Sequence, residues 1–149
     1  MKSILVLNGP NLNLLEERDR RLYGGASLDD IEAALVSRVG TRARIEFFQS
    51  NSEGELITKL HEARGQFGCV IINPGGLTHY SVSLRDALEL FDGVKIEVHL
   101  SNILARERMR RRSVTAEACD AVVAGGGPAA YEAALELALL LSERRMEAE

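Results

Sequence analysis

The 149-residue chain contains only two cysteines, few aromatic residues and no long apolar run. Cys69 and Cys119 are far apart and lack CxxC spacing, so they offer neither a disulfide framework nor a zinc site, and we expect each thiol to be a small buried side chain. No apolar segment approaches the roughly 20 residues of a membrane span. Residues 1–3 lead directly into an apolar segment and do not resemble a signal peptide, so we expect a cytoplasmic protein without metal or membrane contact.

The chain also lacks an excess of basic residues. It has 18 Lys and Arg against 22 Asp and Glu, a formal net charge of -4, which argues against a protein that coats nucleic acid. Five arginines crowd residues 106–112, but no aromatic residues are interleaved with them, so nucleic-acid binding is the weaker interpretation. An arginine that binds a carboxylate within an otherwise solvated patch is favoured.

Apolar segments alternate with segments of helical pattern along the whole chain. The expected strands are residues 3–8, 43–49, 69–73, 94–99 and 120–124, and the expected helices are residues 27–38, 52–65, 81–90 and 128–145. This alternation predicts an α/β fold with a flavodoxin-like, doubly wound, five-stranded parallel sheet of order 2-1-3-4-5 between two helical layers (three-layer α/β/α). Residues 1–149 show no linker or repeat, so we expect a single domain.

Three of the expected strands run directly into polar loops, at residues 8–11, 73–79 and 99–102. The carboxyl ends of parallel strands share one edge of the sheet, and ligands of open α/β sheets bind outside that edge. The three loops are therefore expected to meet at a ligand site. Uncharged amides at or just beyond strand ends could bind hydroxyls or an oxyanion there, and the candidates are Asn8, Asn11, Asn51, Asn73 and Asn102.

Residues 9–26 form the only long segment without a regular pattern, and we expect a functional lid because both of its ends lie near the ligand edge. Within it, Arg18 and Tyr23 are five residues apart. A guanidinium beside a phenol favours the phenolate, which could act as a general base. A mobile surface loop with an incidental tyrosine is the alternative.

His99 ends an expected strand and follows Glu97 by two residues, so both side chains should point to the same side. A carboxylate fixes the tautomer of an adjacent imidazole and raises its proton affinity, which suits a general acid. A core histidine beside a structural glutamate is the alternative, and the location at the ligand edge favours function. His79, just before an expected helix, faces either a substrate or the start of that helix.

Five motifs carry a resemblance to a known family. They are LVLNGPNLNLL at residues 5–15, QSNSEGEL at 49–56, INPG at 72–75, TH at 78–79 followed by LRDA at 84–87, and EVHLSNI at 97–103. In this order and spacing they cover nearly the whole chain, which resembles the type II 3-dehydroquinate dehydratases of the shikimate pathway. That resemblance implies a small-molecule substrate, 3-dehydroquinate, and an anti elimination of water through an enolate to give 3-dehydroshikimate without any cofactor.

The resemblance also implies a role for each matched residue. Tyr23 would remove the proton beside the ketone, and Arg18 would favour its phenolate form and close with the lid. His99, oriented by Glu97, would protonate the departing hydroxyl, and Asn11 would hold a water that stabilises the enolate oxygen. The substrate contacts would be Asn73, His79, Leu100, Ser101 and Arg110.

Oligomerisation follows from the same resemblance. Asp86 would enter the site of a neighbouring subunit in a trimer, and four trimers would form a homododecamer. Arg106 aligns with a second family arginine near the lid.

The departures from the family pattern lie mostly in loops. Residues 16–20 read EERDR where GTREP is common, although Arg18 and Tyr23 keep their spacing. Leu104 replaces a common histidine, Arg108 a common proline, and residues 76–77 an alanine and an aromatic. None of these changes removes a residue assigned to proton transfer. A non-catalytic flavodoxin-like module that binds a small polyhydroxy acid or anion is the alternative function, but such a module would need neither a base nor an acid.

Overall fold

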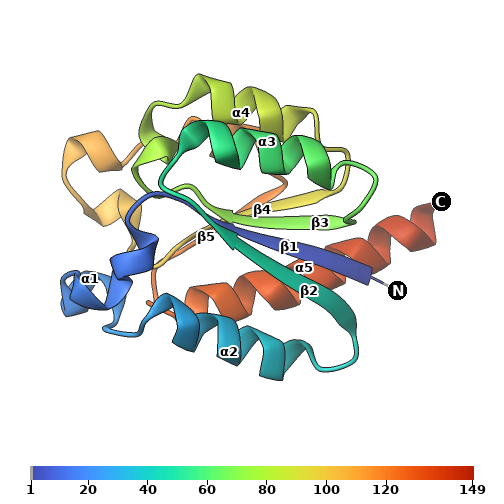
Figure 1. The fold of residues 1–149 in the computed structure, drawn as a ribbon, viewed down its shortest axis with the longest axis horizontal. Helices are drawn as coiled ribbons and strands as arrows, with labels where there is room; N and C mark the ends of the chain where they lie inside the picture. Colours follow the sequence, from blue (N-terminus) through green and yellow to red (C-terminus); the bar gives the residue numbers. More distant parts are fainter. Residues whose placement is uncertain (1) are drawn as a thin grey trace.

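The computed structural model describes residues 2–149, which form one five-stranded sheet between helices (Figure 1). The strands are β1 (Lys2–Asn8), β2 (Ala43–Gln49), β3 (Cys69–Asn73), β4 (Val94–His99) and β5 (Ala121–Ala124). All neighbouring strands are parallel, and their order is β2-β1-β3-β4-β5. The predicted 2-1-3-4-5 sheet is therefore confirmed.

Two helical layers cover the sheet, as Figure 1 shows. The longer helices are α2 (Leu28–Val39), α3 (Glu53–Ala63), α4 (Val82–Glu89) and α5 (Ala129–Ala148), and α2 and α5 lie on the opposite face from α3 and α4. Side chains of β1 alternate between the two cores, because Ile4 and Val6 pack toward α2 and α5 whereas Leu5 and Leu7 pack toward α3 and α4. The central strands are thus buried on both faces, as their continuous apolar sequences predict.

The expected helix starts are produced by local capping. The Ser27 side chain accepts a hydrogen bond from the Asp30 backbone N–H at 3.0 Å, and the Asp30 carboxylate accepts one from the Ser27 N–H at 3.1 Å. Ser52 caps α3 by accepting from the Glu55 N–H at 3.2 Å. Such caps each stabilise a helix by about 1 kcal/mol, so the two helices begin where the sequence places them.

Residues 9–26 differ from the irregular loop that the sequence predicts. They contain the 3-10 helix η1 (Leu12–Glu17) and the single-turn helix α1 (Arg20–Tyr23). Leu12 and Leu15 are fully buried in the core beside α2. Two apolar anchors at i and i+3 lie on one side of a short helix, which explains why the segment folds against the body of the domain.

Four further 3-10 helices lie in the loops, one after β3 and three between β4 and β5. They are η2 (Gly75–His79), η3 (Ile103–Ala105), η4 (Arg108–Arg110) and η5 (Ala116–Ala118). The ends of β1 and β3 are in direct contact, since the Gly9 N–H donates to the Asn73 carbonyl at 2.8 Å. A Cβ on Gly9 would lie 2.4 Å from the Pro74 carbonyl oxygen, so only glycine permits this approach.

The two cysteines are free thiols in different surroundings. Cys69 begins β3 and is buried, whereas Cys119 lies just before β5 and is only partly covered. Burial raises the pKa of Cys119 to about 12, so this thiol stays protonated at neutral pH.

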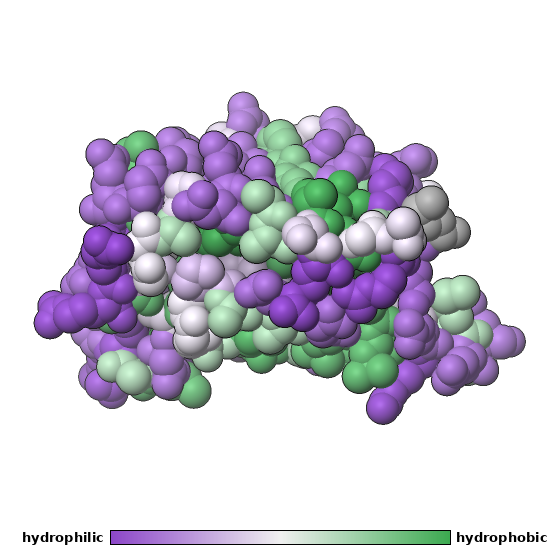
Figure 2. Space-filling view, turned by 90° about the horizontal axis from the view of Figure 1, so that it is seen from below, coloured by the Kyte–Doolittle hydropathy of each residue, from purple (hydrophilic) through white to green (hydrophobic). Residues whose placement is uncertain are grey.

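The outer surface is mostly polar. Figure 2 shows many hydrophilic residues on the side that carries α2 and α5, with smaller apolar areas between them. Ion pairs of Arg38 and Arg42 on the α2 side with Glu132 and Glu136 of α5 lie on this surface. Within residues 2–149, no helix is both long and apolar enough to cross a membrane.

Candidate active site

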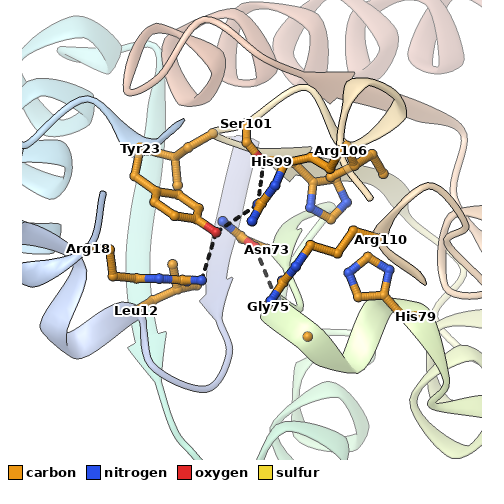
Figure 3. Close-up of a pocket in the computed structure, with 13 residues that line it drawn as sticks. Leu12, Arg18, Tyr23, Asn73, Gly75, His79, His99, Ser101, Arg106 and Arg110 are labelled. Atoms are coloured by element: carbon orange, nitrogen blue, oxygen red, sulfur yellow. Dashed lines mark hydrogen bonds between the residues drawn. The ribbon is translucent and has the colours of Figure 1, made fainter. Parts of the chain in front are cut away.

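One cavity lies where the three polar strand ends meet (Figure 3). The residues that line it are Leu12, Arg18, Tyr23, Asn73, Gly75, Gly76, His79, His99, Leu100, Ser101, Ile103, Arg106 and Arg110. They come from the segment after β1, the loop after β3 and the loop after β4, as predicted from the shared edge of parallel strands. The site therefore combines a rigid sheet edge with a separate segment that carries Arg18 and Tyr23.

The hydroxyl of Tyr23 receives hydrogen bonds from two arginines. Nη2 of Arg18 donates to it at 2.7 Å, and Nη1 of Arg106 donates at 2.8 Å. The Arg18 guanidinium carbon also lies 4.0 Å from the centroid of the Tyr23 ring. The Tyr23 hydroxyl therefore accepts from two positively charged side chains, and the whole residue is only 8% exposed.

The position of Tyr23 is determined by both ends of α1. Asp19 caps the start of the helix by accepting a hydrogen bond from the Arg21 N–H at 2.9 Å. Gly24 ends the helix with a φ of 88°, and a Cβ at this position would lie 2.5 Å from Cδ of Pro128. Glycine is therefore required here both for its left-handed conformation and for contact with the segment before α5.

His99 and Glu97 form a buried pair, as their spacing on β4 predicts. Nε2 of His99 donates to the Glu97 carboxylate at 2.8 Å, and the hydroxyls of Ser113 and Thr115 donate to the same carboxylate. Burial alone would raise the pKa of Glu97. The hydrogen bond and charge of His99, together with the hydrogen bonds from Thr115 and Ser113, outweigh burial and lower that pKa. An ionised Glu97 holds the proton on Nε2, so Nδ1 is the ring nitrogen that is not used by Glu97.

The remaining lining residues are held in place by hydrogen bonds to their neighbours. Ser101 accepts a hydrogen bond from Nη1 of Arg106 at 3.2 Å, and Nε of Arg110 donates to Glu107 at 2.6 Å. Nδ1 of His79 donates to the Arg112 carbonyl at 2.7 Å, because a carbonyl can only accept. The carbonyl oxygen of Leu100 accepts from the Gly127 N–H at 2.9 Å, which connects the site to the start of α5.

Three predicted site residues do not line the cavity within this chain, namely Glu97, Asn11 and Asp86, and Glu97 is connected to the cavity through His99. Asn11 is exposed and has a left-handed φ of 70°, and its N–H donates to the Asn51 side chain at 3.0 Å. Asp86 lies on the exposed side of α4. Of the five strand-end asparagines, only Asn73 reaches the cavity, because the side chain of Asn8 is buried and that of Asn102 caps η3.

Sequence reasoning did not place Arg106 on Tyr23, or Ser113 and Thr115 on Glu97. Within the arginine cluster at residues 106–112, the family resemblance placed Arg106 near the lid and Arg110 on the substrate, but it did not specify the bond of Arg106 to the Tyr23 hydroxyl. Among residues 2–149, no group of three or more His, Cys, Asp or Glu side chains is arranged to hold a metal ion.

Comparison with known proteins identifies the family. Residues 2–139 match the sequence profile of a family described as Dehydroquinase class II. The chain belongs to the class II dehydroquinase family. It is 50% identical over 136 residues to a 3-dehydroquinate dehydratase of Thermotoga neapolitana, an alignment that covers 89% of this chain and 91% of that protein. A 3-dehydroquinate dehydratase of Methylococcus capsulatus is 48% identical over 148 residues, covering 98% and 100%.

Structural comparison agrees with this assignment. The crystal structure of the type II dehydroquinase from Butyrivibrio crossotus matches with a TM-score of 0.89 at 38% identity, covering 92% of this chain and 97% of that chain. The relatives include a catabolic 3-dehydroquinase of Phaeosphaeria nodorum, 48% identical over 139 residues, which cover 92% of this chain and 91% of that protein. The class II dehydroquinase fold predicted from the sequence motifs is thus confirmed.

Proposed function

We propose that this class II dehydroquinase removes water from 3-dehydroquinate with Tyr23 as the base and His99 as the acid, giving 3-dehydroshikimate. The observation that carries the proposal is the hydroxyl of Tyr23, held by two arginines in the cavity that His99 also lines. Membership of the family makes the chain a hydro-lyase. Several relatives are named 3-dehydroquinate dehydratase and others catabolic 3-dehydroquinase, and our proposal places the reaction in the shikimate pathway.

The base step is supported by the charges around Tyr23. A phenol removes a proton next to a ketone in its ionised form, and Arg18 and Arg106 both donate to the phenol oxygen. The electron pair of the broken C–H bond forms the enolate. Asn11 is proposed to hold the water that stabilises the enolate oxygen, since it directly precedes the cavity-lining Leu12.

The acid step is supported by the His99 pair. Collapse of the enolate expels the hydroxyl, which takes a proton from the imidazolium of His99 and leaves as water. The ionised carboxylate of Glu97 stabilises that imidazolium and fixes the ring orientation. Return of the proton from Tyr23 to His99 through solvent completes the cycle, so no net proton is consumed.

Binding of the substrate carboxylate and ring hydroxyls is proposed for Asn73, His79, Leu100, Ser101 and Arg110. Asn73, His79 and Ser101 bring polar side chains to the cavity and Arg110 brings a positive charge, which together suit an anionic polyhydroxy acid. The segment that carries Arg18 and Tyr23 is proposed to act as a lid that opens to admit the substrate ring and then closes over it.

The proposed activity is tested by incubating the purified chain with 3-dehydroquinate and recording the ultraviolet absorbance of the conjugated enone product. We expect steady production of the enone by the folded chain, with purity controlled by a Tyr23→Phe preparation made in parallel. If the folded, assembled chain binds 3-dehydroquinate but yields no enone, the function is binding without catalysis.

We propose that the chain assembles into trimers, and that four trimers form a dodecamer in the cytoplasm, a compartment that suits its free thiols. Asp86 does not line the cavity of its own chain, and Val82 and Leu90 extend the same exposed side of α4 at intervals of four residues. The two apolar side chains are 58% and 50% exposed, as expected for a surface that another subunit covers.

An Asp86→Ala variant tests this assembly. We expect kcat/KM to fall roughly tenfold or more, because a charged residue of one subunit would be missing from the site of its neighbour. Steady-state assays measure kcat/KM, and light scattering after size-exclusion chromatography measures the mass of the assembly. Glu62→Ala, at an exposed position on α3, is the charge-removal control. Unchanged activity and unchanged mass would contradict the intersubunit role.

A further inference from the structure

Tyr131 lies outside the cavity, yet it is bonded to a residue that lines it. Its side chain is fully buried on α5, and its hydroxyl accepts a hydrogen bond from Nδ2 of Asn73 at 3.0 Å. The same hydroxyl donates to Oδ1 of Asn8 at 2.6 Å. Asn8 and Asn73 are directly paired across β1 and β3, so Tyr131 connects the last residues of the two central strands.

The donor and acceptor of each hydrogen bond between Asn73, Tyr131 and Asn8 follow from the bond that Asn73 makes to the Gly75 backbone. The Gly75 N–H can only donate, and it contacts Oδ1 of Asn73 at 3.1 Å. Nδ2 of Asn73 must therefore point toward Tyr131, whose oxygen accepts and whose proton goes to Asn8. Burial raises the pKa of Tyr131, so the hydroxyl keeps the proton that it donates.

We propose that Tyr131 is a positioning residue that holds the Asn73 amide in the one orientation that binds substrate. The inference rests on the proposed function, in which Asn73 contacts the substrate. Asn73 lies among the residues that line the cavity (Figure 3). One N–H of its amide is used by Tyr131, so the second is the one left to donate to a substrate. Without the Tyr131 hydroxyl, Nδ2 of Asn73 loses its buried acceptor, and the Gly75 N–H on Oδ1 is the one remaining bond that orients the amide.

The start of α5 is held close to the site by two more bonds. The Gly125 and Gly127 N–H groups donate to the carbonyls of His99 and Leu100 at 3.0 and 2.9 Å. The hydroxyl of Tyr131 is therefore placed relative to the same strand end that carries the proposed acid. Nδ2 of Asn8 is the one buried side-chain polar atom without a partner in the part of the chain that the structure describes. An unsatisfied buried amide N–H is costly, and the bond that Oδ1 of Asn8 accepts from Tyr131 offsets part of that cost.

Tyr131→Phe removes only the hydroxyl and tests the proposal. We expect KM for 3-dehydroquinate to rise roughly tenfold with kcat changed less than about twofold, because the lost interaction is made in both the bound substrate and the transition state. Tyr80→Phe, at a 68% exposed tyrosine, is the matched control and should keep the wild-type KM. A general loss of stability would lower the active fraction without raising KM.

A double-mutant cycle with Asn73→Ala separates positioning from packing. If Tyr131 acts through Asn73, the double variant Asn73→Ala with Tyr131→Phe should have the same KM as the single variant Asn73→Ala. A wild-type KM in folded Tyr131→Phe, or a rise that adds fully to that of Asn73→Ala, overturns the proposal. Should Tyr131→Phe not fold, Asn8→Leu, with the same number of side-chain heavy atoms, removes the acceptor of the Tyr131 proton. The hydroxyl could then donate to Asn73 only if that amide turned, so KM is expected to rise, and a wild-type KM there also overturns the proposal.

Calorimetric titration of 3-dehydroquinate in the Tyr23→Phe background makes the test independent of turnover. Tyr131→Phe should raise the Kd for 3-dehydroquinate roughly tenfold in that background. An inactive wild-type chain would contradict the proposed function, whereas an active wild-type chain with unchanged affinity in the Tyr131 variant would contradict only this inference.

Discussion

Replacing Tyr23 by phenylalanine is expected to lower kcat roughly 10²- to 10⁴-fold, the usual contribution of a general base. The variant keeps the ring that packs in the core and the cation–π contact with Arg18, but it removes the oxygen to which Arg18 and Arg106 donate. Substrate binding should persist because the sheet-edge contacts remain.

The enone assay measures this loss, and calorimetry measures the remaining affinity. Tyr80→Phe provides the matched control, since its hydroxyl is on an exposed residue away from the cavity. Near-normal kcat in Tyr23→Phe would show that another group removes the proton.

His99→Gln is expected to lower kcat by a similar factor, roughly 10²- to 10⁴-fold, because glutamine cannot supply a proton to the departing hydroxyl. Its amide can still donate to Glu97 in place of Nε2, so the buried carboxylate keeps a partner. The unfolding temperature should therefore change far less than the activity, which separates a chemical role from a structural one.

Activity and thermal unfolding are compared with those of His61→Gln, a substitution at an exposed histidine on α3. A His99→Gln variant that loses stability while keeping its turnover would identify His99 as a core histidine. This was the alternative that the sequence left open.

The fold could be predicted because its signals are local. Continuous apolar strands, the Ser27 capping box and the alternation of strands with helices each arise within a few residues. The pairing of His99 with Glu97 has the same origin, since residues two apart on a strand point to one side. Local geometry also brought Arg18 within reach of Tyr23, five residues away.

The irregular segment at residues 9–26 was predicted wrongly for a physical reason. Its two short helices have little stability on their own, so they form only because Leu12, Leu15 and Tyr23 find a core to bury in. A pattern of this length carries too few apolar positions to identify a helix before its packing partner is known.

The amino-acid sequence by itself determined the parallel sheet, the edge at which a ligand binds and the family to which the chain belongs. Only the tertiary structure decided which of five arginines contacts Tyr23, 83 residues distant, and that Tyr131 bonds to Asn73 and Asn8, which are 58 and 123 residues away from it. Short-range periodicity decides strands, helices and their order. The choice among chemically equivalent side chains depends on distances that exist only after the layers have packed.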